Sequence, residues 1–322
     1  MVENHIYERE SDSIVLQSEH DFNRARNKAI LSEIQHFMDT DKDRLLSFND
    51  VKDILKPKNQ VYMGMRVVPV KMIVGSEGRY RDFNKYFLPK AEYLRTRWQK
   101  VDQAHIKDII LPPIQLYEIG GAYFVRDGNH RVSVARIQGV EHIDAEVISL
   151  SSEVDIIPSM TVDELRMALI ETEKKTFYEQ TNFLELTGDD KLDFTEPGRY
   201  DVVYNHILVH KYYKNQDLSE EISFFDALVS WYRNVYSPII SIIRDEWITL
   251  NFPGNSPSDL YVWIVKHWDF LKKKNGVHFT ILDAARDFSR RYGNHKGWFF
   301  RFIAAKLKIL GTKPKGMGKG RL

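Results

Sequence analysis

Cysteine is absent from the 322-residue sequence, so composition alone excludes disulfides, thiolate metal sites and cysteine nucleophiles. A chain without cysteine suits a reducing compartment, and we expect a cytoplasmic protein. Long apolar runs are also missing, since no stretch approaches the roughly 20 apolar residues that span a bilayer. The first residues lack the basic segment and apolar run of a secretory signal. We therefore expect neither a secreted nor an integral membrane protein.

Acidic side chains are missing from one end of the chain. Residues 295–322 contain eight Lys or Arg and no Asp or Glu, whereas residues 1–294 contain 38 basic and 45 acidic side chains. A basic segment attracts anions, so a nucleic acid or an anionic membrane surface is the partner expected of this tail. Within it, residues 298–310 alternate bulky apolar residues with Arg and Lys at helical spacing. That pattern is equally typical of a last helix packed on its own domain.

Hydrophobic residues make up 43% of the chain, which is ample for buried cores in two domains. Strand-like segments and turns gather in the first half, and amphipathic helical stretches rich in aromatic residues follow Pro158. We expect an α+β fold with a small mixed sheet. Its four parts are N-terminal helices (1–56), the mixed-sheet domain (57–152), a larger all-helical domain (153–294) and a basic amphipathic tail (295–322).

A compact α/β unit is predicted near the middle of the chain. Gly120-Gly121 is a hairpin signal between two runs of strand-forming residues. Gly128 predicts a turn just before a helical pattern. The predicted order is strand 114–119, turn 120–121, strand 122–126, turn 127–129, helix 130–138 and strand 143–148.

The remaining elements follow from periodicity and capping signals. Thr161, with Glu164 three residues later, has the pattern of a capping box. The β-rich stretch 61–74 predicts a strand that is irregular in part, because Pro69 has no N–H to donate. Helices are predicted at 21–38, 48–55, 89–104, 200–213, 219–235, 237–249, 256–274 and 280–292.

The turn at residues 127–131 is the strongest candidate for a functional site. A strand that passes at once into a helix leaves unpaired backbone N–H groups at the mouth of the turn, and the helix dipole adds partial positive charge. Gly128 permits close approach of the backbone, and Arg131 offers a fork of donors that suits phosphate oxygens. Side chains that can add hydrogen bonds are those of Asn129, His130 and Ser133.

A structural interpretation of the same turn is equally supported by composition. Short polar turns before helices are common, and in this interpretation Asp127 caps the helix while Arg131 makes a surface ion pair.

Three runs of residues surround the turn. They are Pro113-Ile114-Gln115-Leu116-Tyr117, Gly121-Ala122-Tyr123-Phe124-Val125, and Asp127-Gly128-Asn129-His130-Arg131-Val132-Ser133-Val134-Ala135-Arg136 with Gly139. Their order resembles the ParB/sulfiredoxin superfamily, in which two strands lead to a Gly-x-x-Arg turn and an alanine-rich helix. The resemblance covers residues 61–150 and implies a nucleotide whose phosphates sit on Gly128, Asn129, His130 and Arg131. The chain also looks like bacterial ParB-like-domain proteins with a long helical C-terminal half.

Departures from the family pattern narrow the expected function. Sulfiredoxins need a cysteine in this turn, so sulfinic acid repair is excluded. CTP-binding partition proteins usually show Gly-Glu-Arg-Arg where this chain has Gly-Asn-His-Arg, which puts CTP hydrolysis and clamp closure in doubt. The ADP-dependent serine kinases of the superfamily have a turn similar to residues 127–131, but no position here matches their catalytic glutamate.

A second flexible turn, Gly75–Arg81, carries two further candidates. Arg79 and Arg81 could close over the phosphates from the opposite side, although a solvated loop is the more common outcome for such a sequence. The general base and the substrate are not indicated by any motif.

His206 and His210 stand four residues apart on a predicted helix, a spacing at which two imidazoles can share a metal ion. No third ligand is evident, and ordinary positions on two helix faces are favoured, so no metal site is expected.

The sequence therefore predicts a nucleotide- or phosphate-binding protein that is regulatory or acts as a phosphotransferase or hydrolase. The expected ligand is a nucleoside di- or triphosphate such as ATP or CTP, and Mg²⁺ is the cation that could bind together with it. The alternative is a DNA-binding, ParB-like transcriptional or partition-type regulator in which the turn is structural and the basic tail supplies the affinity.

Overall fold

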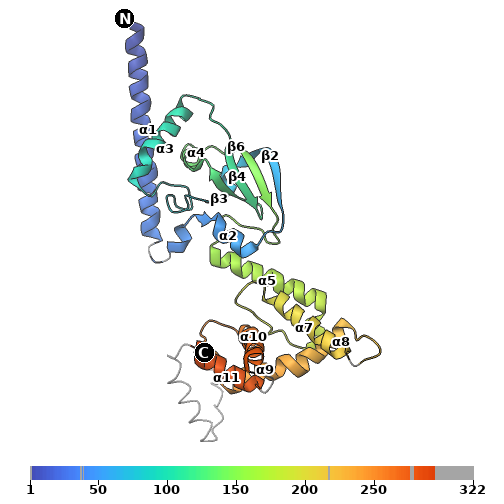
Figure 1. Ribbon diagram of the computed structural model, residues 1–322. Coiled ribbons are helices and arrows are strands. Elements are labelled where there is room, and N and C mark those ends of the chain that lie inside the picture. Colours follow the sequence, from blue (N-terminus) through green and yellow to red (C-terminus); the bar gives the residue numbers. More distant parts are fainter. Residues whose placement is uncertain (1, 37, 39, 217, 276–278, 294–322) are drawn as a thin grey trace, which may run out of the picture. The chain divides into compact units, whose positions relative to one another are not determined.

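The computed structural model describes residues 2–36, 38, 40–216, 218–275 and 279–293 (Figure 1). The predictions for the basic tail at 295–322 fall outside these residues. The chain divides into two compact units, with the boundary between Leu169 and Ile170. Each unit has its own core, so each is described by itself.

Unit 1 is built on a six-stranded mixed sheet with the strand order β1-β3-β5-β4-β6-β2. The β4–β5 hairpin closes through Gly120 and Gly121, with φ of 58° and 76°, as a tight two-residue turn requires. The parallel β4–β6 pair lies beside it. The strands are β1 (Leu46–Ser47), β2 (Gln60–Pro69), β3 (Ile73–Ser76), β4 (Ile114–Ile119), β5 (Ala122–Asp127) and β6 (His142–Leu150).

Helices cover both faces of this sheet because its strands alternate their buried side chains. Val125 of β5 packs in one cluster with Trp98 and Val132, which come from α3 and α4. Its neighbour Phe124 packs on the other face with Leu165. The helices of unit 1 are α1 (Val2–Gln35), α2 (Phe48–Leu55), α3 (Arg95–Ile106), α4 (Asn129–Ile137) and the first part of α5 (Val162–Thr181).

Unit 2 is helical in the residues described, and its core is rich in aromatic side chains. Trp231 donates from Nε1 to the Tyr261 hydroxyl at 3.1 Å, so the polar ends of these buried rings are paired. Its elements are the rest of α5, α6 (Phe183–Thr187), α7 (Arg199–Asn215), α8 (Phe224–Trp231), a π-helical turn (Tyr232–Tyr236), α9 (Ser237–Asp245), α10 (Pro257–Asn275) and α11 (Ile281–Tyr292).

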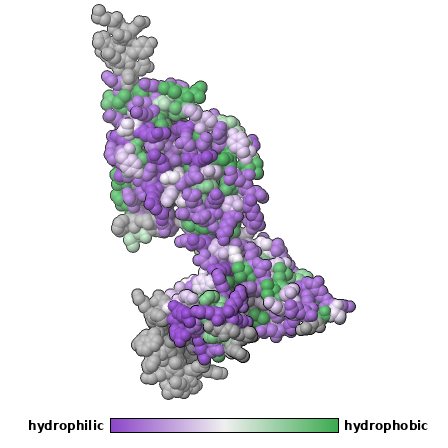
Figure 2. Space-filling model, viewed as in Figure 1, coloured by the Kyte–Doolittle hydropathy of each residue, from purple (hydrophilic) through white to green (hydrophobic). Residues whose placement is uncertain are grey.

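The α+β prediction is confirmed, as is the capping box of α5. The backbone N–H of Thr161 donates to Glu164 Oε2 at 2.8 Å, and the N–H of Glu164 donates to Thr161 Oγ1 at 3.2 Å. The face of the molecule seen in Figure 2 is largely hydrophilic, with hydrophobic side chains in separate patches.

Several element boundaries differ from prediction. The stretch 61–74 is two strands rather than one, because β2 ends at Pro69 and a 3-10 turn, Val70–Met72, separates it from β3. Pro89 does not open a helix but forms a bridge with Phe83, and α3 begins at Arg95. α1 begins at Val2, well before the predicted residue 21. This start was not predicted because the first turns of the helix have no apolar stripe that periodicity could detect. The short helix α6 was not predicted, and α8 starts at Phe224 rather than 219.

Candidate phosphate-binding site

The candidate site begins where β5 ends and α4 starts. Gly128 is the N-cap residue of α4 with φ of 109°, a left-handed value that favours glycine. A Cβ atom at this position would overlap the side chain of Ile114, so glycine also lets the turn lie against β4. None of the described side chains caps this end of α4. Its first N–H groups therefore meet the condition that the anion-binding interpretation requires.

A hollow of about 130 Å³ opens at this end of α4. It is predominantly basic, with three arginines and one carboxylate, and it lies within unit 1. The lining residues are Asp127, Gly128, Asn129, His130 and Arg131 from the turn, Arg79 from the loop after β3, and Arg97 and Val101 from α3.

His130 is buried in this lining, with 6% of its surface exposed. Its ring packs edge-on against Phe83, and its Nε2 lies 3.5 Å from Nη1 of Arg79. A guanidinium can only donate, so this contact makes Nε2 the acceptor and places the imidazole proton on Nδ1. Nδ1 is buried and has no hydrogen-bond partner in the described structure. It is a donor that still needs an acceptor.

The surroundings of His130 also keep it uncharged. Burial, together with the positive charges of Arg79 and Arg97, lowers the pKa of His130 from its ordinary 6.5 to about 4. At neutral pH the ring is therefore neutral, and it can donate one hydrogen bond without adding a cation.

Asn129, the first residue of α4, also has a buried polar atom without a hydrogen-bond partner in the part of the chain that the structure describes. Its side chain is 7% exposed, and its Oδ1 is buried without a partner among the residues described. The amide oxygen and nitrogen can exchange places by rotation, so this end of the side chain can accept or donate. Two successive residues thus leave polar atoms unsatisfied around one small basic hollow.

Arg131 is held by the protein itself. Its Nη2 lies 2.6 Å from Oδ2 of Asp127, and its Nη1 donates to the carbonyl of Pro112. The ion pair of the structural interpretation is therefore present, whereas the Asp127 cap is not. A guanidinium has five N–H donors, so two such bonds orient the group and leave others for a ligand.

The other predicted side chains divide into one that reaches the hollow and two that do not. Arg79 lines it, with Nη1 also 3.2 Å from Oδ2 of Asp82. Arg81 instead lines a separate hollow with Tyr80. Ser133 is fully buried and accepts a hydrogen bond from Nε1 of Trp98 at 2.8 Å. It faces α3 one turn into the helix, away from the mouth of the turn.

Arg97 was not among the residues predicted from the sequence. This exposed side chain lines the hollow from α3, and the described part of the chain provides no ion-pair partner for it. No motif marks it, because its place at the site depends on how α3 packs against α4. A cation without a carboxylate partner is available to an anionic ligand.

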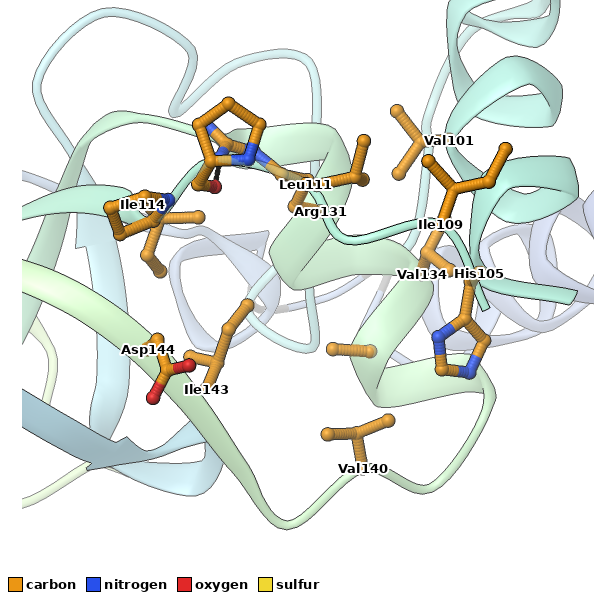
Figure 3. A pocket seen from close by; sticks show the side chains of 13 residues that line it. Val101, His105, Ile109, Leu111, Ile114, Arg131, Val134, Val140, Ile143 and Asp144 are labelled. Atoms are coloured by element: carbon orange, nitrogen blue, oxygen red, sulfur yellow. Dashed lines mark hydrogen bonds between the residues drawn. The ribbon is translucent and has the colours of Figure 1, made fainter. Parts of the chain in front are cut away.

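An apolar hollow of about 210 Å³ adjoins the basic one and shares Arg131 and Val101 with it. Figure 3 shows three of the residues that line this apolar hollow: Arg131, Ile109 on the side of α3, and Ile143 on β6. His105 and Asp144 are polar groups in an otherwise mainly apolar lining. The other lining residues are Leu111, Pro112, Pro113, Ile114, Val134, Ala135 and Val140.

The two histidines of α7 have separate partners in unit 2. Nδ1 of His206 lies 3.0 Å from the Tyr261 hydroxyl, and Nε2 of His210 lies 3.0 Å from Oγ of Ser230. Among the described residues, no group of three or more His, Asp or Glu side chains has the arrangement of a metal site. The two imidazoles therefore bond to different helices, His206 to α10 and His210 to α8.

Comparisons of the sequence with protein families and with curated proteins find no match. Among solved structures, the chain is similar to a crystal form of a Pnob8-like ParB-N domain. Sequence identity is 11% and the TM-score is 0.19, over 79% of this chain and 100% of that chain. A TM-score of this size is too low to indicate a function, so the proposed function is derived from the residues of the site. None of the helices in the described ranges has the length and apolar character needed to cross a membrane.

Proposed function

We propose that unit 1 binds a nucleoside di- or triphosphate, with the phosphates in the basic hollow at the N-terminus of α4. The observation that carries this proposal is the pair of buried side chains, Asn129 and His130, which each have a polar atom without a partner among the described residues, beside a helix end that no described side chain caps. Buried polar atoms in native proteins are nearly always hydrogen-bonded. Phosphate oxygens would supply the missing acceptor for His130.

Charge supports an anion in this position. Arg79, Arg97 and Arg131 line the hollow against the single carboxylate of Asp127, and the helix dipole adds to their field. The neutral state of His130 lets it approach these arginines without repulsion. Asp127 would also provide a carboxylate for a magnesium ion that accompanies the phosphates, since Mg²⁺ commonly binds through one or two carboxylates together with substrate phosphates.

The adjoining apolar hollow supports a nucleotide rather than a free phosphate. Ligand pockets usually measure roughly 300 to 1,000 Å³, and neither hollow reaches that size alone. Arg131 borders both hollows, so one ligand with an anionic end and a flat apolar part would fill them together. Asp144 and His105 would then be available to the polar edge of a base.

Titration calorimetry with ATP, ADP, CTP and GTP, each with and without magnesium, tests this function. Arg97→Gln is the sharpest variant, because the side chain is exposed and its loss disturbs no ion pair with any residue that the structure describes. Removing one charge-assisted hydrogen bond of about 1.5 to 3 kcal/mol is expected to weaken binding by about 10-fold or more. Phosphate release measured in the same samples detects hydrolysis.

Lys100→Gln is the matched control. Lys100 is exposed on the same helix and does not line the hollow, so the same loss of charge should leave binding unchanged. Pyrophosphate separates the two hollows, because it should bind more weakly than any nucleotide whose base occupies the apolar one. The proposal fails if no nucleotide binds, or if Arg97→Gln and Lys100→Gln have equal effects.

A further inference from the structure

β2 forms one edge of the sheet in unit 1 (Figure 1). It is last in the strand order and pairs along one side with β6. With 10 residues, at roughly 3.3 Å per residue, the edge of β2 that pairs with no other described strand is about 33 Å long. The opposite edge of the sheet, β1, has only 2 residues. A long free edge presents unpaired N–H and C=O groups to any strand that can reach it.

The side chains of this edge are unusually apolar for exposed positions. Natural proteins blunt such edges with lysines, prolines or short strands, but β2 carries one charge, Arg66, and its proline is the last residue. The exposed fractions are Val61 56%, Tyr62 65%, Met63 40%, Met65 55% and Val67 68%.

The sequence of β2 indicates which partner suits it, since it reads almost the same in both directions about Gly64: Val61-Tyr62-Met63-Gly64-Met65-Arg66-Val67. Two identical strands that pair antiparallel about a two-fold axis bring each residue against its mirror position. An axis at Gly64 gives the pairs Val61 with Val67, Tyr62 with Arg66, and Met63 with Met65, each between the two copies.

Gly64 fits a position on such an axis. Its φ is 70°, and a Cβ atom added there would meet nothing within 4 Å, so the space around it is open. A glycine inside a strand often marks a bulge or a place where another backbone approaches closely. The bulge toward β6 between Tyr62 and Gly64 is present, and the open side is free for the approach.

We propose that β2 is a self-recognition edge, along which two copies of this chain pair antiparallel about Gly64. The two sheets become continuous, and each Arg66 guanidinium lies against the Tyr62 ring of the other copy, an attractive cation–π geometry. A stable interface buries roughly 800 Å² on each partner. One strand edge supplies only part of that area, so the dimer is reversible, in the micromolar range. This inference is independent of the phosphate site.

Sedimentation equilibrium of the full chain, from micromolar to millimolar concentration, tests the pairing. Tyr62→Lys places a lysine opposite Arg66 of the other copy, and like charges directly opposite destabilise a strand pair. The dimer dissociation constant should rise by about 10-fold or more. Adding Arg66→Glu to Tyr62→Lys creates two opposite-charge pairs across the axis and should restore the dimer.

Met167→Lys is the control, because Met167 is 66% exposed and belongs to α5, not to β2. It should dimerise like the unaltered protein, and circular dichroism checks that all variants remain folded. A chain that stays monomeric at every concentration overturns the proposal. Dimerisation unaffected by Tyr62→Lys overturns it as well, and so does a double variant that fails to recover.

Discussion

Hydrogen-bond partners decide what individual side chains of the candidate site can do. Arg131 is oriented by Asp127 and by the carbonyl of Pro112, so part of its hydrogen-bonding capacity is already used. Arg97 has no comparable hydrogen bond or ion pair with the described part of the chain. Nδ1 of His130 and Oδ1 of Asn129 are buried and have no partner in the described ranges, and an unpaired buried polar atom lowers stability. The site therefore combines a fixed arginine, an available arginine and two unsatisfied side chains.

We expect His130 to make unit 1 less stable at mildly acidic pH. Its folded-state pKa of about 4 lies below the ordinary 6.5, so the unfolded chain binds the proton first as pH falls. The contribution of neutral His130 to the free energy of unfolding is complete above pH 6.5 and is lost as the pH falls through about 4. Thermal unfolding across this range measures it, and His130→Asn should flatten that part of the pH profile.

The exposed His142→Asn variant is the control for this profile. His142 lies on β6, outside the hollow, and its replacement should leave the acid-dependent loss of stability in place. An unchanged slope in His130→Asn would show that another group titrates in this range.

Between elements, the hydrogen bond from Trp98 to Ser133 fastens α3 to α4. Both side chains are fully buried in unit 1, and the contact holds together the two helices that line the basic hollow. Ser133 thus acts on the site through packing, although the sequence suggested a direct role.

Ser133→Ala should therefore separate stability from binding. It leaves Nε1 of Trp98 buried and unpaired, which should lower the free energy of unfolding by about 1 to 3 kcal/mol. Nucleotide affinity in the folded protein should change little. Urea unfolding and calorimetry measure the two quantities, and Arg97→Gln should show the reverse pattern. A large loss of affinity in Ser133→Ala at full stability would place the hydroxyl at the ligand.

At the scale of the whole molecule, the two units have separate hydrophobic clusters, and the chain boundary between them lies within α5. Unit 2 also has its own buried charge, Asp287, which is 8% exposed. Burial alone would raise the pKa of Asp287, but hydrogen bonds from His267, Arg291 and Arg290 bring it down to about 2.

We expect two unfolding transitions that respond to different changes. A nucleotide should raise only the transition of unit 1, because binding stabilises the state that contains the site. Asp287→Asn should lower only the other, and the stabilisation by Asp287 should be present above its ordinary pKa of 3.8 and be lost as pH falls toward 2. Differential scanning calorimetry resolves these effects. A single transition that shifts as a whole under both changes would contradict the independence of the two units.

Local signals allowed a good part of unit 1 to be predicted. Gly120-Gly121 defines a hairpin because both residues must take positive φ, and Thr161 with Glu164 defines a helix start through hydrogen bonds within four residues. The turn at 127–131 was predicted in the same way, because Gly128 is followed directly by a helical pattern in the sequence. Boundaries that depend on packing were missed: Pro89, a common first residue of helices, lies instead in a β-bridge with Phe83.

By itself, the sequence determined the α+β class, the tight turns at Gly120-Gly121 and Gly128, and the capping box of α5, because those follow from backbone conformation and neighbours in the chain. Only the tertiary structure decided that Arg97 lines the hollow, that Ser133 bonds Trp98 instead of facing the hollow, and that β2 is the edge strand of the described sheet. Burial, pairing and strand order depend on which faces meet in space, and residues far apart in the chain contribute to each of them.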